Sequence, residues 1–191
     1  MLILYIHGFL SSPSSHKAQL VQAFCAQQSS PIEFQCPSLP AYPASAMSIL
    51  EKSISENSHQ AVGLIGSSLG GYYATYLAQR FQLPAVVINP AVKPYNLMAN
   101  YLDQDLANYH TQEVSRLQAH HVEELRALEL NRLQYPELIW LLTQTGDETL
   151  DYRQAVERYQ DCKQTIEEGG DHSFQGFEGW LPEVIQFLKE H

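Results

Sequence analysis

The sequence predicts an α/β protein built on a doubly wound, mainly parallel sheet of six strands, with a small helical cap insertion. Two observations carry this prediction. Short apolar segments without polar alternation recur along the chain, as expected for strands that are buried on both faces. Between them lie segments whose apolar residues repeat at helical spacing, which favours right-handed crossovers in a parallel sheet. The 191 residues suffice for one domain with its own core, spanning 1–191.

Six segments qualify as strands in chain order. The first is aliphatic and aromatic throughout, the fourth is bounded by prolines, and the sixth is short and ends at a pair of glycines. Their predicted ranges are Leu2–Ile6, Ile32–Cys36, Ala61–Ile65, Pro84–Pro90, Leu138–Thr143 and Thr165–Glu168. Helical spacing predicts four helices between or after them, at about His16–Gln27, Ser45–Glu56, Gly71–Arg80 and Gly179–Glu190. The loop Pro37–Pro43 holds three prolines, which disfavour regular structure.

The stretch of about forty-five residues at 91–135 is longer than a simple crossover requires. Apolar residues predict two helices in it, Asn96–Tyr109 and about Ala119–Leu130. Two interpretations stay open: a longer helical connection packed on the sheet, or a cap over a binding site. Ligands bind at the carboxyl ends of parallel strands, where such a cap would lie.

Composition excludes several classes of protein. A formal net charge of −10, with no basic block, argues against nucleic acid and against anionic membranes as partners. The three cysteines are far apart and form no C-x-x-C pair, which is typical of reduced thiols in the cytoplasm. The apolar start Met1–Ile6 is too short for a signal peptide or a membrane span. We therefore expect a cytoplasmic monomer or homodimer.

The motif Gly66-Ser67-Ser68-Leu69-Gly70 lies between a predicted strand and a predicted helix. This is G-x-S-x-G in the strand–turn–helix context that lifts a serine onto a sharp corner. Gly66 and Gly70 supply the small residues that let the two backbones approach. Ser68 is thus the candidate nucleophile, and Ser67 is interpreted as structural.

A serine hydroxyl needs a base and a third group that orients the base. His172 follows the sixth strand, and Asp147 follows the fifth, so both lie at the sheet edge that carries Ser68. The order Ser, Asp, His is that of the α/β-hydrolase triad. Glu148, next to Asp147, and Asp171, next to His172, remain alternative orienting acids.

Two backbone N–H groups should stabilise the oxyanion. One belongs to Leu69, directly after the nucleophile, and the other to Phe9 in the loop after the first strand. Gly8 allows that loop to approach, and His7 is interpreted as holding it through hydrogen bonds. The chain has no dinucleotide fingerprint, phosphate-binding loop or H-E-x-x-H motif, so we expect no cofactor and no metal.

As a set, five segments resemble the small bacterial YqiA-like esterases of the α/β-hydrolase superfamily. They are residues 4–13, 66–75, 89–94, 144–153 and 168–174, which read LYIHGFLSSP, GSSLGGYYAT, NPAVKP, QTGDETLDYR and EGGDHSF. The resemblance implies a compact α/β-hydrolase fold, activity on short acyl esters and acyl-CoA thioesters, and Ser68, Asp147 and His172 as the triad. Residues 101–135 match least, and substrate choice is expected to be set there.

Other activities fit the same residues. The motif would also serve a carbon–carbon bond hydrolase or an acyltransferase, and a hydrolase pocket can persist in a non-catalytic binding module.

Overall fold

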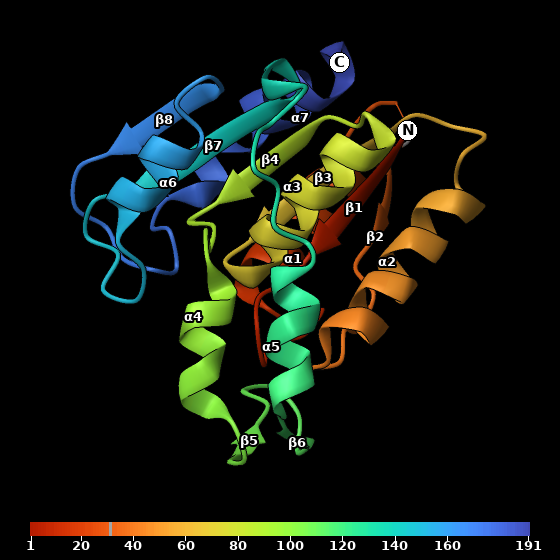
Figure 1. Cartoon of the computed structure of the whole chain (residues 1–191). Coiled ribbons are helices and arrows are strands. Elements are labelled where there is room, and N and C mark those ends of the chain that lie inside the picture. The colour runs from red at the N-terminus through yellow and green to blue at the C-terminus, as the bar shows by residue number, and fades with distance from the viewer. Residues whose placement is uncertain (31) are drawn as a thin grey trace.

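A six-stranded sheet organises the computed structural model, which describes residues 1–30 and 32–191 (Figure 1). The strand order is β2-β1-β3-β4-β7-β8, and every pair of neighbours is parallel. The strands are β1 Leu2–Ile6, β2 Glu33–Gln35, β3 Val62–Ser67, β4 Ala85–Ile88, β7 Ile139–Gln144 and β8 Lys163–Glu167. The predicted doubly wound α/β fold is confirmed, with all six strands at the expected places.

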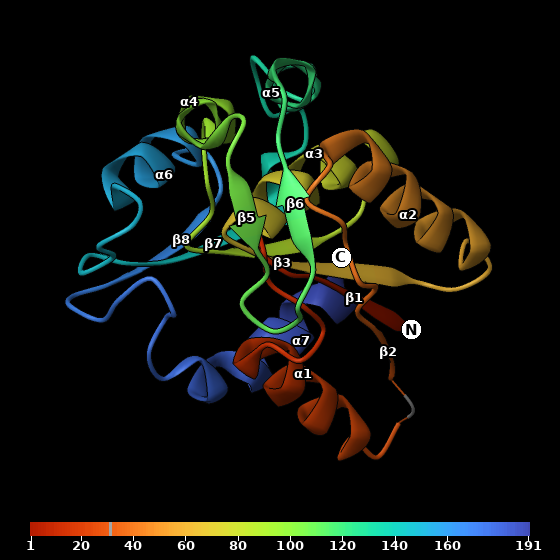
Figure 2. The same cartoon turned by 90° about the horizontal axis from the view of Figure 1, so that it is seen from below.

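Helices cover both faces of the sheet, as Figure 2 shows. Alternate strand residues point to opposite faces, so Leu2, Leu4 and Ile6 join one core while Ile3 and Tyr5 join the other. The first core also packs against α2 Pro43–Glu56, α3 Leu69–Phe81 and α6 Tyr152–Arg158. The second packs against α1 His16–Ala26, a 3₁₀ helix at Phe177–Trp180 and α7 Leu181–Glu190.

Two boundaries and one helix differ from the prediction. Helix α2 begins inside the proline-rich loop, at Pro43. Proline fits the first helical position because an N–H there would have no intrahelical acceptor, so its absence costs nothing. Strand β8 begins earlier, at Lys163, since an edge strand tolerates polar residues that hide its pattern. Helix α6 was not predicted; Asp151 caps it by accepting a hydrogen bond of 3.1 Å from the N–H of Arg153.

The insertion between β4 and β7 departs furthest from expectation. It contains α4 Pro94–Met98, a 3₁₀ helix Ala99–Tyr101, β5 Asp105–Ala107, β6 Val114–Arg116 and α5 Ala119–Arg126, followed by a 3₁₀ helix Pro136–Leu138. The predicted helix Asn96–Tyr109 is therefore wrong beyond Tyr101, and the second predicted helix ends at Arg126 rather than Leu130. Leu102 adopts an extended conformation, with ψ 142°, which ends the helical geometry, and Asp103 follows with a left-handed φ of 58°. An antiparallel hairpin, β5 with β6, follows instead.

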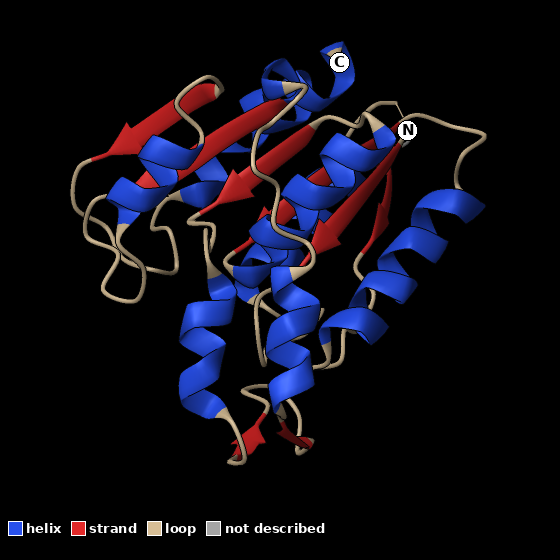
Figure 3. Cartoon of the chain, viewed as in Figure 1, coloured by secondary structure: helices blue, strands red, loops and turns tan. Residues whose placement is uncertain are grey.

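The insertion stands beyond the carboxyl ends of the sheet strands, which the arrowheads in Figures 1 and 3 mark. Its hairpin is tied by the ion pair between Arg116 and Asp105, at 2.8 Å. It also reaches the loop after β1, because the N–H of Tyr109 donates to the carbonyl of Leu10 at 2.8 Å. Across the described residues, none of the helices combines the length and the apolarity that crossing a bilayer requires.

Candidate active site

Ser68 occupies the corner between β3 and α3. Its backbone has φ 56° and ψ −120°, a conformation that L-residues rarely adopt and that turns the chain sharply. The corner is fixed by its neighbours, since the N–H of Ser68 donates to the carbonyl of Ile88 at 3.0 Å. Strain held by such surroundings is typical of functional turns.

The two motif glycines make this corner possible. A Cβ on Gly66 would lie 2.7 Å from the Cβ of Ala74, inside α3, and would overlap the carbonyl of Gly70. A Cβ on Gly70 would overlap the carbonyl oxygen of Ile6 in β1. The backbones of β1, β3 and α3 therefore meet around Ser68, as the motif predicted.

The structure brings the three predicted side chains together. His172 Nε2 lies 3.1 Å from Ser68 Oγ, and His172 Nδ1 lies 2.8 Å from Asp147 Oδ2. The Asp147 side chain is 1% exposed and that of His172 is 24% exposed, so the acid is buried while the imidazole reaches the surface. With Nδ1 protonated toward Asp147, Nε2 is free to accept the Ser68 hydroxyl proton.

Asp147 is held as a carboxylate. Burial raises its pKa, but the His172 ring and the N–H groups of Leu150 and Thr149 donate to it and outweigh burial, so its pKa is lowered overall. Those two N–H groups lie 2.8 and 2.9 Å from Oδ1. One oxygen of Asp147 is thus fixed by backbone, which leaves the other for the imidazole.

The alternative acids make other contacts. Glu148 accepts from the backbone N–H of His172 at 3.0 Å, not from its ring. Asp171 turns back on its own loop, where it accepts from the N–H of Ser173 and from Gln175 Nε2 at 2.9 and 2.8 Å. Of the three carboxylates considered from sequence, Asp147 is the one that meets the imidazole ring.

Two buried amides that sequence reasoning missed hold the His172 loop. Asn89, at the end of β4, donates through Nδ2 to the carbonyls of Asp171 and His172 at 3.0 and 3.2 Å. Its Oδ1 accepts from Thr143 Oγ1 and from the N–H of Gln144. Its φ of 40° is one that asparagine tolerates better than most residues.

Gln144 completes this network from the end of β7. Its Oε1 accepts from the N–H groups of Asp171 and Gln175, and its Nε2 donates to the carbonyl of Gln175 and to Glu167. The signal for both residues was their place directly after buried strands, at the sheet edge that holds Ser68.

His7 is buried at 3% exposure. Its Nδ1 donates to the carbonyl of Gly8 at 2.9 Å, and its Nε2 accepts from the N–H of Leu39 at 3.1 Å. Burial lowers its pKa, which favours this neutral tautomer. The geometry fits the predicted role of holding the loop after β1.

Phe9 and Leu69 both line the cavity that contains Ser68. The N–H of Leu69 lies in the first turn of α3, where intrahelical acceptors are missing and the helix dipole is positive. A Cβ on Gly8 would come within 3.3 Å of the Ser68 Cβ, so the loop that carries Phe9 passes directly beside the serine.

This cavity has a volume of about 700 Å³ and lies between the sheet edge and the insertion. The insertion contributes Pro94, Leu97, Met98, Tyr101, Tyr109 and His110 to its lining. Leu97, Tyr101 and Tyr109 are 42%, 44% and 78% exposed, which is unusual for large apolar side chains. The insertion at residues 91–135 therefore forms one wall of the cavity that contains Ser68.

One side-chain group within residues 1–30 and 32–191 resembles a metal site. Donor atoms of His120, His121 and Glu124 lie within 4.8 Å of one another at the start of α5. However, His121 Nδ1 accepts a hydrogen bond of 3.0 Å from the N–H of Gln118. In the neutral ring, the other nitrogen, Nε2, then carries the proton. A metal on Nδ1 would replace the N–H of Gln118, and a metal on Nε2 would move the proton to Nδ1, so either would break this helix cap.

A family model described as "Uncharacterised protein family (UPF0227)" matches residues 2–189. This chain belongs to UPF0227. The membership confirms the resemblance to YqiA-like proteins.

Solved structures similar to this UPF0227 chain are α/β hydrolases. Est1E from Butyrivibrio proteoclasticus has a TM-score of 0.73 at 14% identity, over 99% of this chain and 87% of its own. Alpha/beta hydrolase domain-containing protein 10 from mouse has a TM-score of 0.75 at 16% identity, over 99% and 90%. The esterase domain of a Rhodothermus marinus protein has a TM-score of 0.69 at 16% identity, over 99% and 85%. At these identities the likeness establishes the α/β-hydrolase fold.

Proposed function

We propose that this protein is a serine hydrolase that cleaves acyl esters through an acyl-enzyme. The observation that carries the proposal is the continuous contact from Asp147 through His172 to Ser68, at 2.8 and 3.1 Å, on the wall of a large cavity. A hydroxyl, an imidazole and a buried carboxylate in this order form the arrangement that activates serine for acyl transfer. The titles "esterase" and "hydrolase" of similarly folded proteins agree with this class.

In the proposed reaction, His172 Nε2 takes the Ser68 proton while Oγ attacks the substrate carbonyl. Asp147 accepts from Nδ1–H and stabilises the imidazolium that forms. The N–H groups of Phe9 and Leu69 donate to the oxyanion. The imidazolium then protonates the departing alcohol or thiol, and water, activated by the same imidazole, releases the acid from Ser68.

Short acyl esters are the proposed substrates, with acyl-CoA thioesters as an extension of the same chemistry. Apolar side chains of the insertion, among them Leu97, Met98 and Tyr101, line the cavity beside Ser68 and suit an acyl chain. Because no step requires an added group, the proposed reaction needs no cofactor.

A fluorophosphonate probe combined with two adjacent serine variants tests the proposal. Ser68→Ala should abolish labelling and lower kcat for p-nitrophenyl esters by at least about 10³-fold. Ser67→Ala is the matched control, because Ser67 precedes Ser68 directly and is buried at the end of β3. The probe should still label this variant. Labelling of Ser68→Ala, or full activity in that variant, would refute the assignment.

A further inference from the structure

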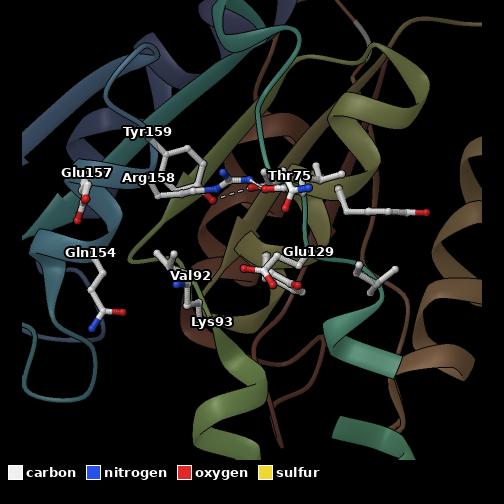
Figure 4. Close-up of a pocket in the computed structure, with 13 residues that line it drawn as sticks. Thr75, Val92, Lys93, Glu129, Gln154, Glu157, Arg158 and Tyr159 are labelled. Carbon is white, nitrogen blue, oxygen red and sulfur yellow. Dashed lines mark hydrogen bonds between the residues drawn. The ribbon is translucent and has the colours of Figure 1, made fainter. Parts of the chain in front are cut away.

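A second cavity, of about 400 Å³, lies on the other side of the segment that follows β4. Its walls are α3, the β4–α4 connection, the chain after α5, and α6 (Figure 4). The two cavities share one stretch of backbone: Val92 and Lys93 line the second, while Ala91 and Pro94 line the one with Ser68. Its volume falls within the range of small-molecule sites.

Three buried hydroxyl groups in the lining of this second cavity donate their protons to other atoms of the protein. Tyr72 donates to the carbonyl of Leu125 at 2.9 Å. Thr75 Oγ1 donates to the carbonyl of Gly71 at 2.8 Å, so Tyr159, whose oxygen is 2.7 Å from Thr75, must be the donor of that pair. The hydroxyl groups of Tyr72, Thr75 and Tyr159 therefore donate within the protein, so donors for a ligand come from other side chains of the lining.

Arg158 supplies such donors. It is half-buried at the end of α6, and one of its nitrogens donates to the carbonyl of Leu130 at 2.6 Å. Among the residues that the structure describes, its guanidinium forms no ion pair. Most of its five N–H groups thus remain available, in the forked geometry that binds a carboxylate.

Glu129 faces the same hollow with the opposite charge. It also forms no ion pair within the described chain. Arg158 and Glu129 nevertheless both influence the pKa of the Tyr72 hydroxyl. Burial raises the pKa of Tyr72; Glu129 raises it further, and Arg158 lowers it. Figure 4 shows Arg158, Glu129 and Lys93 around one hollow, with Glu157 and Gln154 along α6. Arg158 and Glu129 therefore line one cavity, together with Lys93 and Glu157, without forming an ion pair with each other.

We propose that this cavity is a second binding site, distinct from that of Ser68, for a zwitterion of the α-amino acid type. The ligand carboxylate binds Arg158, and its ammonium group binds Glu129. A simple anion would meet the repulsion of Glu129, and a simple cation that of Arg158, so both charges on one ligand match the site best. Val92 and Leu128 offer apolar contact, which suits an aliphatic side chain.

Calorimetric titration with L-leucine as the probe tests this site. Saturable binding is expected for the full-length protein, with no saturable binding of leucinamide, which lacks the carboxylate, or of N-acetyl-leucine, which lacks the ammonium group. Arg158→Met and Glu129→Gln should each weaken leucine binding at least about tenfold, as expected for a lost charge-assisted hydrogen bond.

Two controls separate binding from folding. Both variants should keep the wild-type ester hydrolysis rate, because neither residue lines the cavity that contains Ser68. Thermal melting checks that both variants fold, and Arg158→Met is expected to melt somewhat lower because it loses the hydrogen bond to the carbonyl of Leu130. Glu183→Gln, a charge removal in α7 on the opposite face of the sheet, should leave leucine binding unchanged. Three results would overturn the proposal. The first is the absence of saturable leucine binding, and the second is equally strong binding of leucinamide. The third is that the protein binds inorganic phosphate instead of leucine and that Glu129→Gln strengthens this phosphate binding.

Discussion

At the scale of single residues, the environment of Asp147 distinguishes it from its neighbour Glu148. Both follow β7, and both accept a hydrogen bond from His172, but Asp147 accepts it from the ring and Glu148 from the backbone. Ring contact controls the tautomer and the charge of the base, whereas backbone contact controls only where the loop lies. The two carboxylates therefore have separable roles.

Asp147→Asn should lower kcat by about 10⁴-fold with little change in the melting temperature, because an amide can hold the imidazole only in the wrong tautomer. Glu148→Gln, its matched control, should lose less than about tenfold, since its oxygen still accepts from the His172 N–H. Initial rates with a p-nitrophenyl ester give both values. A greater loss in Glu148→Gln than in Asp147→Asn would reverse the assignment.

Position along the chain was enough to predict that Ser68, Asp147 and His172 lie close together, since each follows a strand whose carboxyl end the parallel sheet brings to one edge. It was not enough for Asn89 and Gln144. No sequence motif marks an amide side chain as part of such a network. The hydrogen bonds of Asn89 and Gln144 depend on which backbone carbonyls lie near them once the His172 loop has folded.

At the scale of elements, Asn89 joins three of them: β4, β7 and the loop after β8. It makes four hydrogen bonds in a position that is 2% exposed, so losing its side chain would leave several buried polar groups unpaired. Its role is to position His172 rather than to contact the substrate.

Asn89→Gly should lower kcat with little change in KM and should cost about 1–3 kcal/mol of unfolding free energy for each buried polar group left unpaired. Glycine tolerates the positive φ, so backbone strain does not confuse the result. Gln175→Ala, which removes an exposed contact on the same loop, is the control. Unchanged kcat and an unchanged rate of fluorophosphonate labelling in Asn89→Gly would contradict a positioning role.

Elements with fully buried strands were predicted well, because their apolar runs have no competing interpretation: β1, β3, β4 and β7 all lie near the expected ranges. Helix α6 and the hairpin of β5 and β6 were missed. Both are short, and three-residue strands have too few positions for a period to show. Their geometry depends on tertiary contacts such as that of Tyr109 with Leu10.

At the scale of the whole molecule, Lys17 links α1 to the loop that carries His172 and makes stability depend on pH. It donates to the carbonyl of Ser173 at 2.6 Å. Burial lowers the pKa of Lys17 to about 8, although Asp171 and Asp147 oppose the shift. Between about pH 8 and pH 10, the unfolded chain therefore binds more protons at this lysine than the folded chain does.

The unfolding free energy of the wild type should accordingly rise, relative to that of Lys17→Met, as pH increases through this window. Urea unfolding of both proteins at about pH 7.5 and pH 10 measures the difference, in which other titrating groups cancel. The same comparison between the wild type and Lys52→Met is the control for removing a charge, because Lys52 is exposed. A difference that falls with pH would show that burial does not dominate at Lys17.

For the proposed esterase activity, the insertion is expected to set the acyl selectivity. Tyr109→Ala should lower kcat/KM for p-nitrophenyl hexanoate about threefold or more while leaving the acetate unchanged, because Tyr109 lines the cavity and only the longer chain is expected to reach it. Val114→Ala is the control: Val114 is 60% exposed in the same hairpin but does not line the cavity. Equal losses with both esters would place the acyl chain elsewhere.

The insertion leaves and re-enters the sheet between β4 and β7, which are hydrogen-bonded neighbours. Evolution could lengthen, shorten or replace it without reordering a single strand, so it is free to diverge faster than the sheet that carries Ser68. Yet it lines both cavities, through Tyr101 and Tyr109 on one side and Val92 and Glu129 on the other. A lineage that remodels this insertion around the cavity of Ser68 would therefore alter the second cavity in the same step.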